Sequence, residues 1–236
     1  MLLVANGVGA ANRLTMPMKT FNSHPPIPTI IFLDLGGVLI EDFTSGNRLQ
    51  DTIQEIGVSQ SDEVRFRELW AVHAAPEVCL SYPADNFHRI IEAEFGIKLP
   101  KSYSLLQHGF VDHFDPNPSI EPVIARLIGR VKLGLLTNMY PGMLEAIKAK
   151  PGLLPTVPWD VVIDSSEVKL QKPDKAIFEY ATERAGEPKE RILLIDNTRA
   201  NVDAAAEIGW QTFYYDSDHY IRSSKQLGSF LIELLQ

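Results

Sequence analysis

The sequence is poor in cysteine, in long apolar runs and in basic residues. Cys79 is the only cysteine among 236 residues, which excludes an internal disulfide and a zinc site built from several thiolates. No apolar run approaches the roughly 20 residues of a membrane-spanning helix. The 22 basic and 30 acidic side chains give a formal net charge of −8, and phosphate backbones need clustered Lys and Arg. We therefore expect a soluble, cytoplasmic protein without a nucleic-acid or membrane partner.

The remaining composition is typical of a globular protein, with 45% hydrophobic and 22% charged residues. The first 25 residues differ from the rest, because they contain Arg13 and Lys19 but no acidic residue. We predict a flexible arm over residues 1–25, and an organelle-targeting segment is the alternative interpretation. The acidic surplus elsewhere in the chain is compatible with a carboxylate cluster that binds a cation.

Five short segments have the pattern of buried strands, at residues 29–35, 131–137, 159–164, 191–196 and 211–215. Continuously apolar strands are buried on both faces, which is typical of a parallel sheet covered by helices. Helical patterns lie between them, at residues 120–130, 143–150, 175–185 and 200–208. This alternation predicts an α/β fold with a Rossmann-like, doubly wound parallel sheet.

A helical block interrupts the alternation after the first strand. Four stretches before residue 119 have helical patterns and none has the pattern of a buried strand; they are residues 47–56, 61–73, 83–95 and 102–114. A segment of this length is an inserted domain rather than a loop. We predict an α/β core formed by residues 26–44 and 119–236, and an inserted helical cap formed by residues 45–118.

Polar residues follow the apolar runs where several of the predicted strands end. They are Asp34, Thr137-Asn138, Ser165-Ser166 and Asp196-Asn197, with Lys172-Pro173 opening the helix after the third strand. The carboxyl ends of parallel strands share one edge of the sheet, where ligands bind in open α/β folds. Two carboxylates, a hydroxyl and an ammonium supply the parts that phosphoryl transfer needs, and carboxylate oxygens suit Mg²⁺.

Four motifs in this order resemble those of haloacid dehalogenase-like hydrolases. The first is Ile31-Phe32-Leu33-Asp34-Leu35-Gly36-Gly37-Val38-Leu39, the second Leu135-Leu136-Thr137-Asn138, the third runs from Lys172 to Phe178, and the fourth from Leu194 to Gly209. The predicted helical insertion lies where this family carries its type 1 cap. The resemblance covers residues 28–236, and the Asp-Leu-Gly-Gly motif resembles the branch with epoxide-hydrolase N-terminal domains and sugar-1-phosphatases.

The resemblance implies a role for each motif residue. Asp34 would be a nucleophile that forms an aspartyl-phosphate, and Lys172 would offset the charge of nucleophile and phosphate. The phosphoryl group would be held by Thr137, Asn138, Gly36 and Gly37, and Mg²⁺ by Asp34, the Gly36 carbonyl, Asp196 and Asn197. The implied function is Mg²⁺-dependent hydrolysis of a small phosphate monoester, such as a sugar phosphate, by a monomer or homodimer.

The sequence departs from the family pattern at three positions. Gly36 stands where most family phosphatases have a second aspartate, which acts as acid and base. Asn197 stands where the fourth motif often has a second acid, and Lys169 where the third motif usually has glycine. Two alternatives therefore remain open: a catalytically weak or inactive binding protein, and a 2-haloacid dehalogenase, which also lacks the second aspartate. Against the dehalogenase alternative, Arg48 lies farther after the nucleophile position than the arginine of dehalogenases does, and residues 196–198 differ from the dehalogenase motif.

Overall fold

The computed structural model describes residues 25–43, 48–73 and 80–236. Cys79 and the arm predicted over residues 1–25, apart from its last residue, lie outside these ranges. None of the helices in the described ranges is long and apolar enough to cross a membrane.

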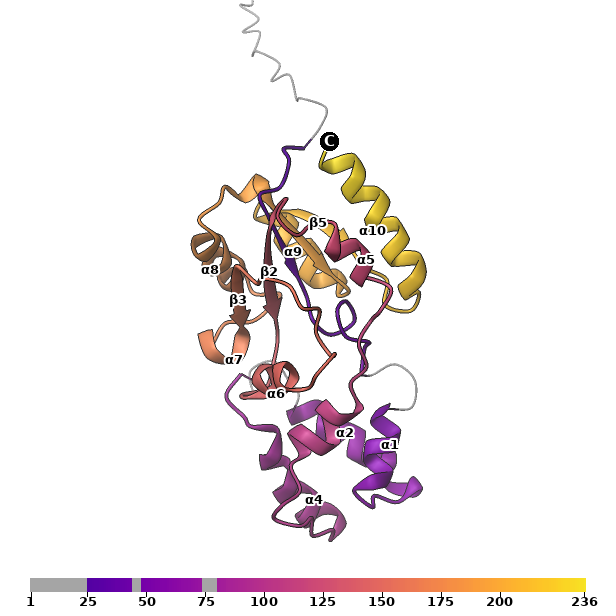
Figure 1. The fold of residues 1–236 in the computed structure, drawn as a ribbon. Coiled ribbons are helices and arrows are strands. Elements are labelled where there is room, and N and C mark those ends of the chain that lie inside the picture. The colour runs from indigo at the N-terminus through magenta and orange to yellow at the C-terminus, as the bar shows by residue number, and fades with distance from the viewer. Residues whose placement is uncertain (1–24, 44–47, 74–79) are drawn as a thin grey trace, which may run out of the picture.

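A five-stranded parallel sheet forms the centre of the protein (Figure 1). Its strand order is β3-β2-β1-β4-β5, so the first strand of the chain occupies the middle of the sheet. The strands are β1 (Ile30–Leu33), β2 (Lys132–Thr137), β3 (Val161–Asp164), β4 (Ile192–Asp196) and β5 (Gln211–Tyr214). All five strands predicted from the sequence are present, each within two residues of its predicted bounds, and the predicted α/β fold is confirmed.

The register of the three central strands brings their carboxyl ends to the same level. Leu33, the last residue of β1, pairs with Leu135 in β2 and with Ile195 in β4. The residues that follow therefore meet at one edge of the sheet. This edge carries Asp34, Thr137 and Asp196.

Helices cover both faces of the sheet because its strands are apolar at consecutive positions (Figure 1). Ile31 and Leu33 face a core cluster built with α5 (Glu121–Ala125) and α10 (Tyr220–Leu234). Ile30 and Phe32 face a second cluster, built with α8 (Lys175–Ala185) and α9 (Arg199–Glu207). The connections after β2 and β3 add two short helices, α6 (Met143–Ala149) and α7 (Ser165–Val168).

Among the helices of the α/β core, α5 is shorter than expected, and α7 and α10 have no predicted counterpart. The helix predicted over residues 120–130 ends at Ala125, because Arg126 and Arg130 donate to carbonyls only three residues back and form turns instead. The long helix α10 was not predicted. It buries Leu227, Leu231 and Leu234 against the sheet. Serines and a glycine also lie in this helix, and they weaken its helical pattern in the sequence.

Every named element that the structure describes between β1 and β2, up to α5, is helical. These elements are α1 (Arg48–Glu55), a 3₁₀ turn (Gln60–Asp62), α2 (Glu63–His73), a 3₁₀ turn (Ala84–Phe87), α4 (His88–Phe95), a π-helical segment (Leu105–Phe110) and a 3₁₀ turn (Val111–His113). The single helix expected over residues 102–114 is thus a π-helical turn followed by a 3₁₀ turn. The division of the chain at residues 45 and 118 stays a prediction.

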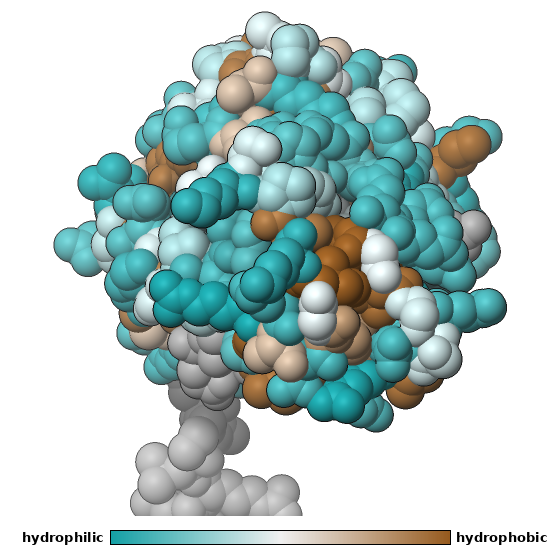
Figure 2. Space-filling model, turned by 90° about the horizontal axis from the view of Figure 1, so that it is seen from below, coloured by the Kyte–Doolittle hydropathy of each residue, from teal (hydrophilic) through white to brown (hydrophobic). Residues whose placement is uncertain are grey.

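This helical insertion has its own apolar core, which includes Phe66, Phe87, Ile91 and Phe110. The same cluster continues into α6, so the insertion packs against the core at the carboxyl edge of the sheet, as Figure 1 shows. Seen from the end at which α4 lies, the surface is mostly hydrophilic, with one apolar patch (Figure 2).

Candidate active site

A row of three buried charged side chains lies at the carboxyl edge of the sheet. The ammonium Nζ of Lys172 is 2.9 Å from Asp34 Oδ1 and 2.6 Å from Asp196 Oδ2. Asp34 follows β1 and Asp196 ends β4, whereas Lys172 comes from the loop before α8. Residues 138 sequence positions apart are thus brought into direct contact, as their order in the four motifs predicted.

Lys172 is held in this row by its backbone as well as by its ammonium group. Its N–H donates to Asn138 Oδ1 at 2.9 Å, and Asn138 Nδ2 donates to the Lys172 carbonyl at 2.8 Å. Burial lowers the pKa of Lys172, but the neighbouring carboxylates of Asp34 and Asp196 outweigh this effect, so the pKa is raised above its ordinary value. The two carboxylates therefore favour the charged form of Lys172.

Asp196 is completely buried, and its carboxylate accepts from three donors. Oδ1 accepts from the Thr198 N–H at 2.8 Å, and Oδ2 accepts from Lys172. Asn201 Nδ2 lies 3.1 Å from each of the two oxygens. All three donors are needed, because a buried carboxylate is costly unless it is paired and hydrogen-bonded.

Asp34 is less completely satisfied than Asp196. Its Oδ1 accepts from the Leu35 N–H at 2.7 Å and contacts Lys172. Its Oδ2 accepts no hydrogen bond from any residue that the structure describes. Burial raises the pKa of Asp34 to about 6; Lys172 opposes this shift and the charge of Asp196 adds to it. The free oxygen and the buried position are what an attacking carboxylate needs.

Gly36 and Gly37, which follow Leu35 in the loop after Asp34, differ in whether the structure requires a glycine. Gly37 has a φ of +78°, and a Cβ on it would lie 2.0 Å from Asn197 Nδ2, so the amide of Asn197 packs directly on its backbone. Gly36 is exposed and a Cβ there would meet nothing within 4 Å. The backbone therefore leaves room for a side chain at position 36.

The remaining predicted residues lie around this row. Thr137 is buried at the end of β2, in register with Asp164 of β3. Asn197 donates to Ser217 Oγ at 3.3 Å and forms no hydrogen bond with Lys172 or Asp34, which the structure also describes. Ser165, which follows β3, accepts from the Met139 N–H at 2.9 Å and so holds the loop after Thr137-Asn138.

Sequence reasoning assigned no role to two residues that the structure adds to the site. Asn201 lies within the fourth motif, but its contact with Asp196 depends on the first turn of α9, which brings residue 201 back over residue 196. Lys169 has a φ of +57°, the left-handed conformation that favours glycine, and its Nζ donates to the Leu80 carbonyl in the insertion at 2.8 Å. The departure from glycine at position 169 therefore accompanies a contact between core and insertion.

The oxygen donors at this edge fit Mg²⁺. Asp34 Oδ2, the Gly36 carbonyl and Asn197 Oδ1 are hard donors, and Mg²⁺ is often held by one or two carboxylates together with water and substrate phosphate. The described residues contain no group of three or more His, Cys, Asp or Glu side chains that would suit zinc or another tightly chelated metal. Two carboxylates around one ammonium also leave a net negative charge, which favours a cation.

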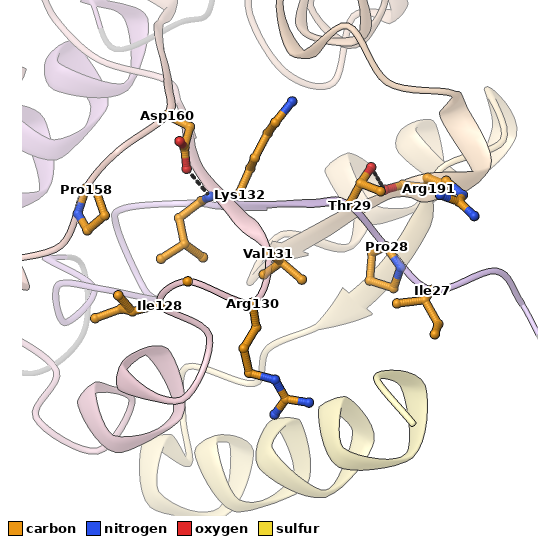
Figure 3. A pocket seen from close by; sticks show the side chains of 12 residues that line it. Ile27, Pro28, Thr29, Ile128, Arg130, Val131, Lys132, Pro158, Asp160 and Arg191 are labelled. Atoms are coloured by element: carbon orange, nitrogen blue, oxygen red, sulfur yellow. Dashed lines mark hydrogen bonds between the residues drawn. The ribbon is translucent and has the colours of Figure 1, made fainter.

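A separate cavity of about 650 Å³ lies at the amino ends of the strands, on the opposite edge of the sheet (Figure 3). Its cations are Arg130, Lys132 and Arg191, which point in three different directions. Lys132 is 2.8 Å from Glu187 Oε1. Because these charges do not converge, the cavity offers no phosphate site, and the carboxyl edge remains the candidate active site.

Comparisons with known proteins point to one family. A family model described as haloacid dehalogenase-like hydrolase matches residues 28–209. The pyrimidine 5'-nucleotidase YjjG of Escherichia coli (strain K12) is 28% identical over 106 residues, 44% of this chain and 46% of that protein. The rhythmically expressed gene 2 protein of Drosophila melanogaster is 30% identical over 106 residues, 42% of this chain and 38% of that protein. The chain thus spans less than half the length of these relatives.

Solved structures share the fold. A HAD family enzyme of Bacteroides thetaiotaomicron, crystallised with magnesium and inorganic phosphate, gives a TM-score of 0.64 at 23% identity and covers 80% of this chain and 95% of its own. An L-2-haloacid dehalogenase of Xanthobacter autotrophicus gives a TM-score of 0.57 at 19% identity, over 78% of this chain and 76% of its own. At these identities the likeness extends to the fold alone.

Proposed function

The chain belongs to the haloacid dehalogenase-like hydrolases, and we propose that it hydrolyses a small phosphate monoester, such as a sugar phosphate, with Mg²⁺ as cofactor. The observation that carries this proposal is the buried row in which Lys172 Nζ lies 2.9 Å from Asp34 and 2.6 Å from Asp196. In this row the proposed nucleophile, Asp34, has one oxygen that accepts no hydrogen bond from a described residue and lies beside the Lys172 ammonium group.

The proposed reaction has two steps, both centred on Asp34. In the first, Asp34 Oδ2 attacks phosphorus, the bond from phosphorus to the ester oxygen breaks, and the leaving oxygen takes a proton from water. In the second, water attacks the phosphorus of the aspartyl-phosphate and gives a proton to the hydroxide left by the first step. The bond from phosphorus to Asp34 Oδ2 breaks, inorganic phosphate is released and the carboxylate is regenerated. Lys172 offsets the negative charge of nucleophile and phosphoryl group in both steps.

The phosphoryl oxygens are proposed to bind the Thr137 hydroxyl and the backbone amides of Asn138 and Gly36. Binding by Gly37 stays a prediction, since its N–H already donates to the Ile40 carbonyl at 2.7 Å. Asp34, the Gly36 carbonyl and Asn197 would hold Mg²⁺, and ligation by Asp196 stays a prediction, since its oxygens already accept from three donors. When bound, Mg²⁺ supplies positive charge that stabilises the developing charge on the phosphoryl oxygens.

The glycine at position 36 bears on the substrate. It offers no proton to a leaving group, and a positioned acid typically contributes about 10²–10⁴-fold to the rate. A leaving group of low pKa, such as an anomeric sugar hydroxyl, needs less protonation. The proposed function therefore favours esters of acidic alcohols over those of simple alkyl alcohols.

The test is a panel of phosphate monoesters, assayed with purified protein and Mg²⁺, and with EDTA in its place. We expect turnover that requires Mg²⁺ and falls at least about 10³-fold in Asp34→Asn, because an amide is a poor nucleophile. Asp164→Asn is the matched control: Asp164 also lies at a strand end and has the same 8% exposure, and Asn keeps its capping contact with Ser166.

Three outcomes would contradict the proposal. The first is the absence of any turnover on the panel. The second is activity that survives in Asp34→Asn. If the protein instead binds phosphate esters without turnover, and Asp34→Asn still binds them, it is a binding protein. The third is chloride release from 2-chloropropionate without Mg²⁺, which would indicate a dehalogenase.

A further inference from the structure

Asn201 is a buried amide whose donor group points at the carboxylate of Asp196. It lies near the start of α9 with 6% of its surface exposed, and its Nδ2 is 3.1 Å from both Asp196 oxygens. Asparagine is a poor helix former, and burying an amide is costly unless it is hydrogen-bonded. The contact with Asp196 is thus the physical reason for an asparagine at this position.

The contact restricts how the Asp196 carboxylate can turn. The Thr198 N–H holds Oδ1 at 2.8 Å, and Asn201 bridges both oxygens. A rotation of the carboxylate would break at least one of these contacts. Oδ2, the oxygen that lies 2.6 Å from Lys172 Nζ, is therefore fixed by donors that belong to the first turn of α9.

We propose that Asn201 is a positioning residue for the reaction, which acts through Asp196 to keep the Lys172 ammonium beside Asp34. The inference rests on the proposed function, because it takes Asp34 as the nucleophile and Lys172 as its charge partner. Asn201 donates to Asp196 and not to Asp34, so it acts on the proposed nucleophile only through Asp196 and Lys172.

The line of contacts runs from Asn201 through Asp196 to Lys172. Without the Asn201 donor, Asp196 keeps only the Thr198 N–H and Lys172, and the carboxylate can turn about its last side-chain bond. Lys172 then follows the turning carboxylate and leaves Asp34 Oδ1. The transferring phosphoryl group loses a fixed cation, which affects the chemical step more than substrate binding.

The kinetic test uses Asn201→Leu, which keeps the size and branching of the side chain and removes the donor, and Asn201→Ala. We expect kcat to fall at least about tenfold in both, as for other residues that orient a functional group, with KM changed less than about threefold. In a Lys172→Ala background, Asn201→Leu should cause no further loss. Thr182→Val is the control, because it removes a hydrogen bond to Trp210 in the same core, away from the site.

A second readout does not depend on activity. The Lys172 side chain is 1% exposed, so brief acetylation with acetic anhydride should leave it unmodified in the wild type. We expect its labelling, measured by mass spectrometry relative to the exposed Lys98, to rise several-fold in Asn201→Leu and Asn201→Ala but not in Thr182→Val. This measurement decides the inference even if the wild-type protein hydrolyses none of the phosphate esters.

Two results would overturn the inference. One is a loss of kcat by Asn201→Leu that is the same in the Lys172→Ala background, since Asn201 would then act independently of Lys172. The other is unchanged labelling of Lys172 in both Asn201 variants. Asn201→Ala, which only removes atoms, keeps the test valid if Asn201→Leu does not fold.

Discussion

At the scale of single residues, the buried carboxyl group of Asp34 makes the stability of the protein depend on pH. Its pKa is raised from 3.8 to about 6, first by burial, with Lys172 opposing the shift and Asp196 adding to it. The native state thus binds this proton more tightly than the unfolded state does. The resulting stabilisation is present below pH 4 and is lost as the pH rises through about 6.

Asp34→Asn removes this dependence, because asparagine does not titrate. We expect the free energy of unfolding of Asp34→Asn, relative to that of the wild type, to increase by about 3 kcal/mol at most as the pH rises from 4 to 7. Urea denaturation at several pH values, in EDTA so that no divalent cation binds, measures the difference. For the control Thr182→Val, the difference in free energy of unfolding from the wild type should not change over this pH range. If the difference for Asp34→Asn is also independent of pH, the raised pKa is contradicted.

The adjacent glycines allow a matched pair of substitutions. Gly36→Ala should leave the free energy of unfolding within about 0.5 kcal/mol of the wild type, since a Cβ there meets nothing within 4 Å. Gly37→Ala should cost about 2 kcal/mol or more, because φ is +78° and the Cβ would displace Asn197. Denaturant titration compares the two variants, and equal losses would refute this reading of the loop.

The open space at position 36 also permits a gain of activity. Gly36→Asp should raise kcat for an alkyl phosphate by about 10²-fold or more and change kcat for p-nitrophenyl phosphate far less, because only the alkoxide needs a proton. The ratio of the two rates is the measurement. A variant that improves both substrates equally would show that the new carboxylate does not protonate the leaving group.

The row formed by Asp34, Lys172 and Asp196 could be predicted from the sequence because strand ends in a parallel sheet share an edge. The amide contacts of Asn138 and Asn201 could not be predicted in the same way. They depend on how the loop before α8 and the first turn of α9 fold back over the strand ends, which neither periodicity nor motif spacing specifies.

At the scale of elements, Lys169 illustrates a local conflict between backbone and sequence. Its φ of +57° costs a residue with a Cβ about 1–2 kcal/mol, and its ammonium group donates to the Leu80 carbonyl across to the insertion. The loop therefore combines a strained backbone with a contact that glycine cannot make.

Two substitutions separate these contributions. Lys169→Gly should raise the Tm, since relief of about 1 kcal/mol exceeds the worth of one exposed hydrogen bond. Lys169→Met keeps the strained backbone and loses the hydrogen bond, so its Tm should lie at or below that of the wild type. Thermal unfolding followed by circular dichroism gives the order, and a Tm for Lys169→Met above that for Lys169→Gly would contradict this account.

The strands were predictable element by element, whereas the helices were less so. β4 is apolar from Ile192 to Ile195, a pattern typical of a strand buried on both faces. In α10 the residues between the buried positions Leu227 and Leu231 include Gly228 and Ser229, which weaken the helical signal. The short α5 ends where three-residue turns replace helical hydrogen bonds, a competition that the sequence pattern does not resolve.

At the scale of the whole molecule, contacts fix the insertion where the chain enters and leaves it. Arg48, near the start of the insertion, pairs with Glu41 of the core and lies 3.0 Å from Oδ2 of Asp115, near the end of the insertion. Lys150, which follows α6, donates at 2.8–2.9 Å to the carbonyls of Val111, Asp112 and Phe114. These contacts hold the insertion over the edge where the proposed site lies.

The central position of β1 has a consequence for the synthesis of the protein. Ile30 pairs with Lys132 on one side and with Ile192 on the other, so the strand that is translated first must wait for partners about 100 and 160 residues later. Until β4 has left the ribosome, one side of a wholly apolar strand lacks its neighbour, which is a state prone to aggregation. The arrangement that unites Asp34 with Asp196 thus leaves β1 without one of its two neighbours until residue 196 has been made.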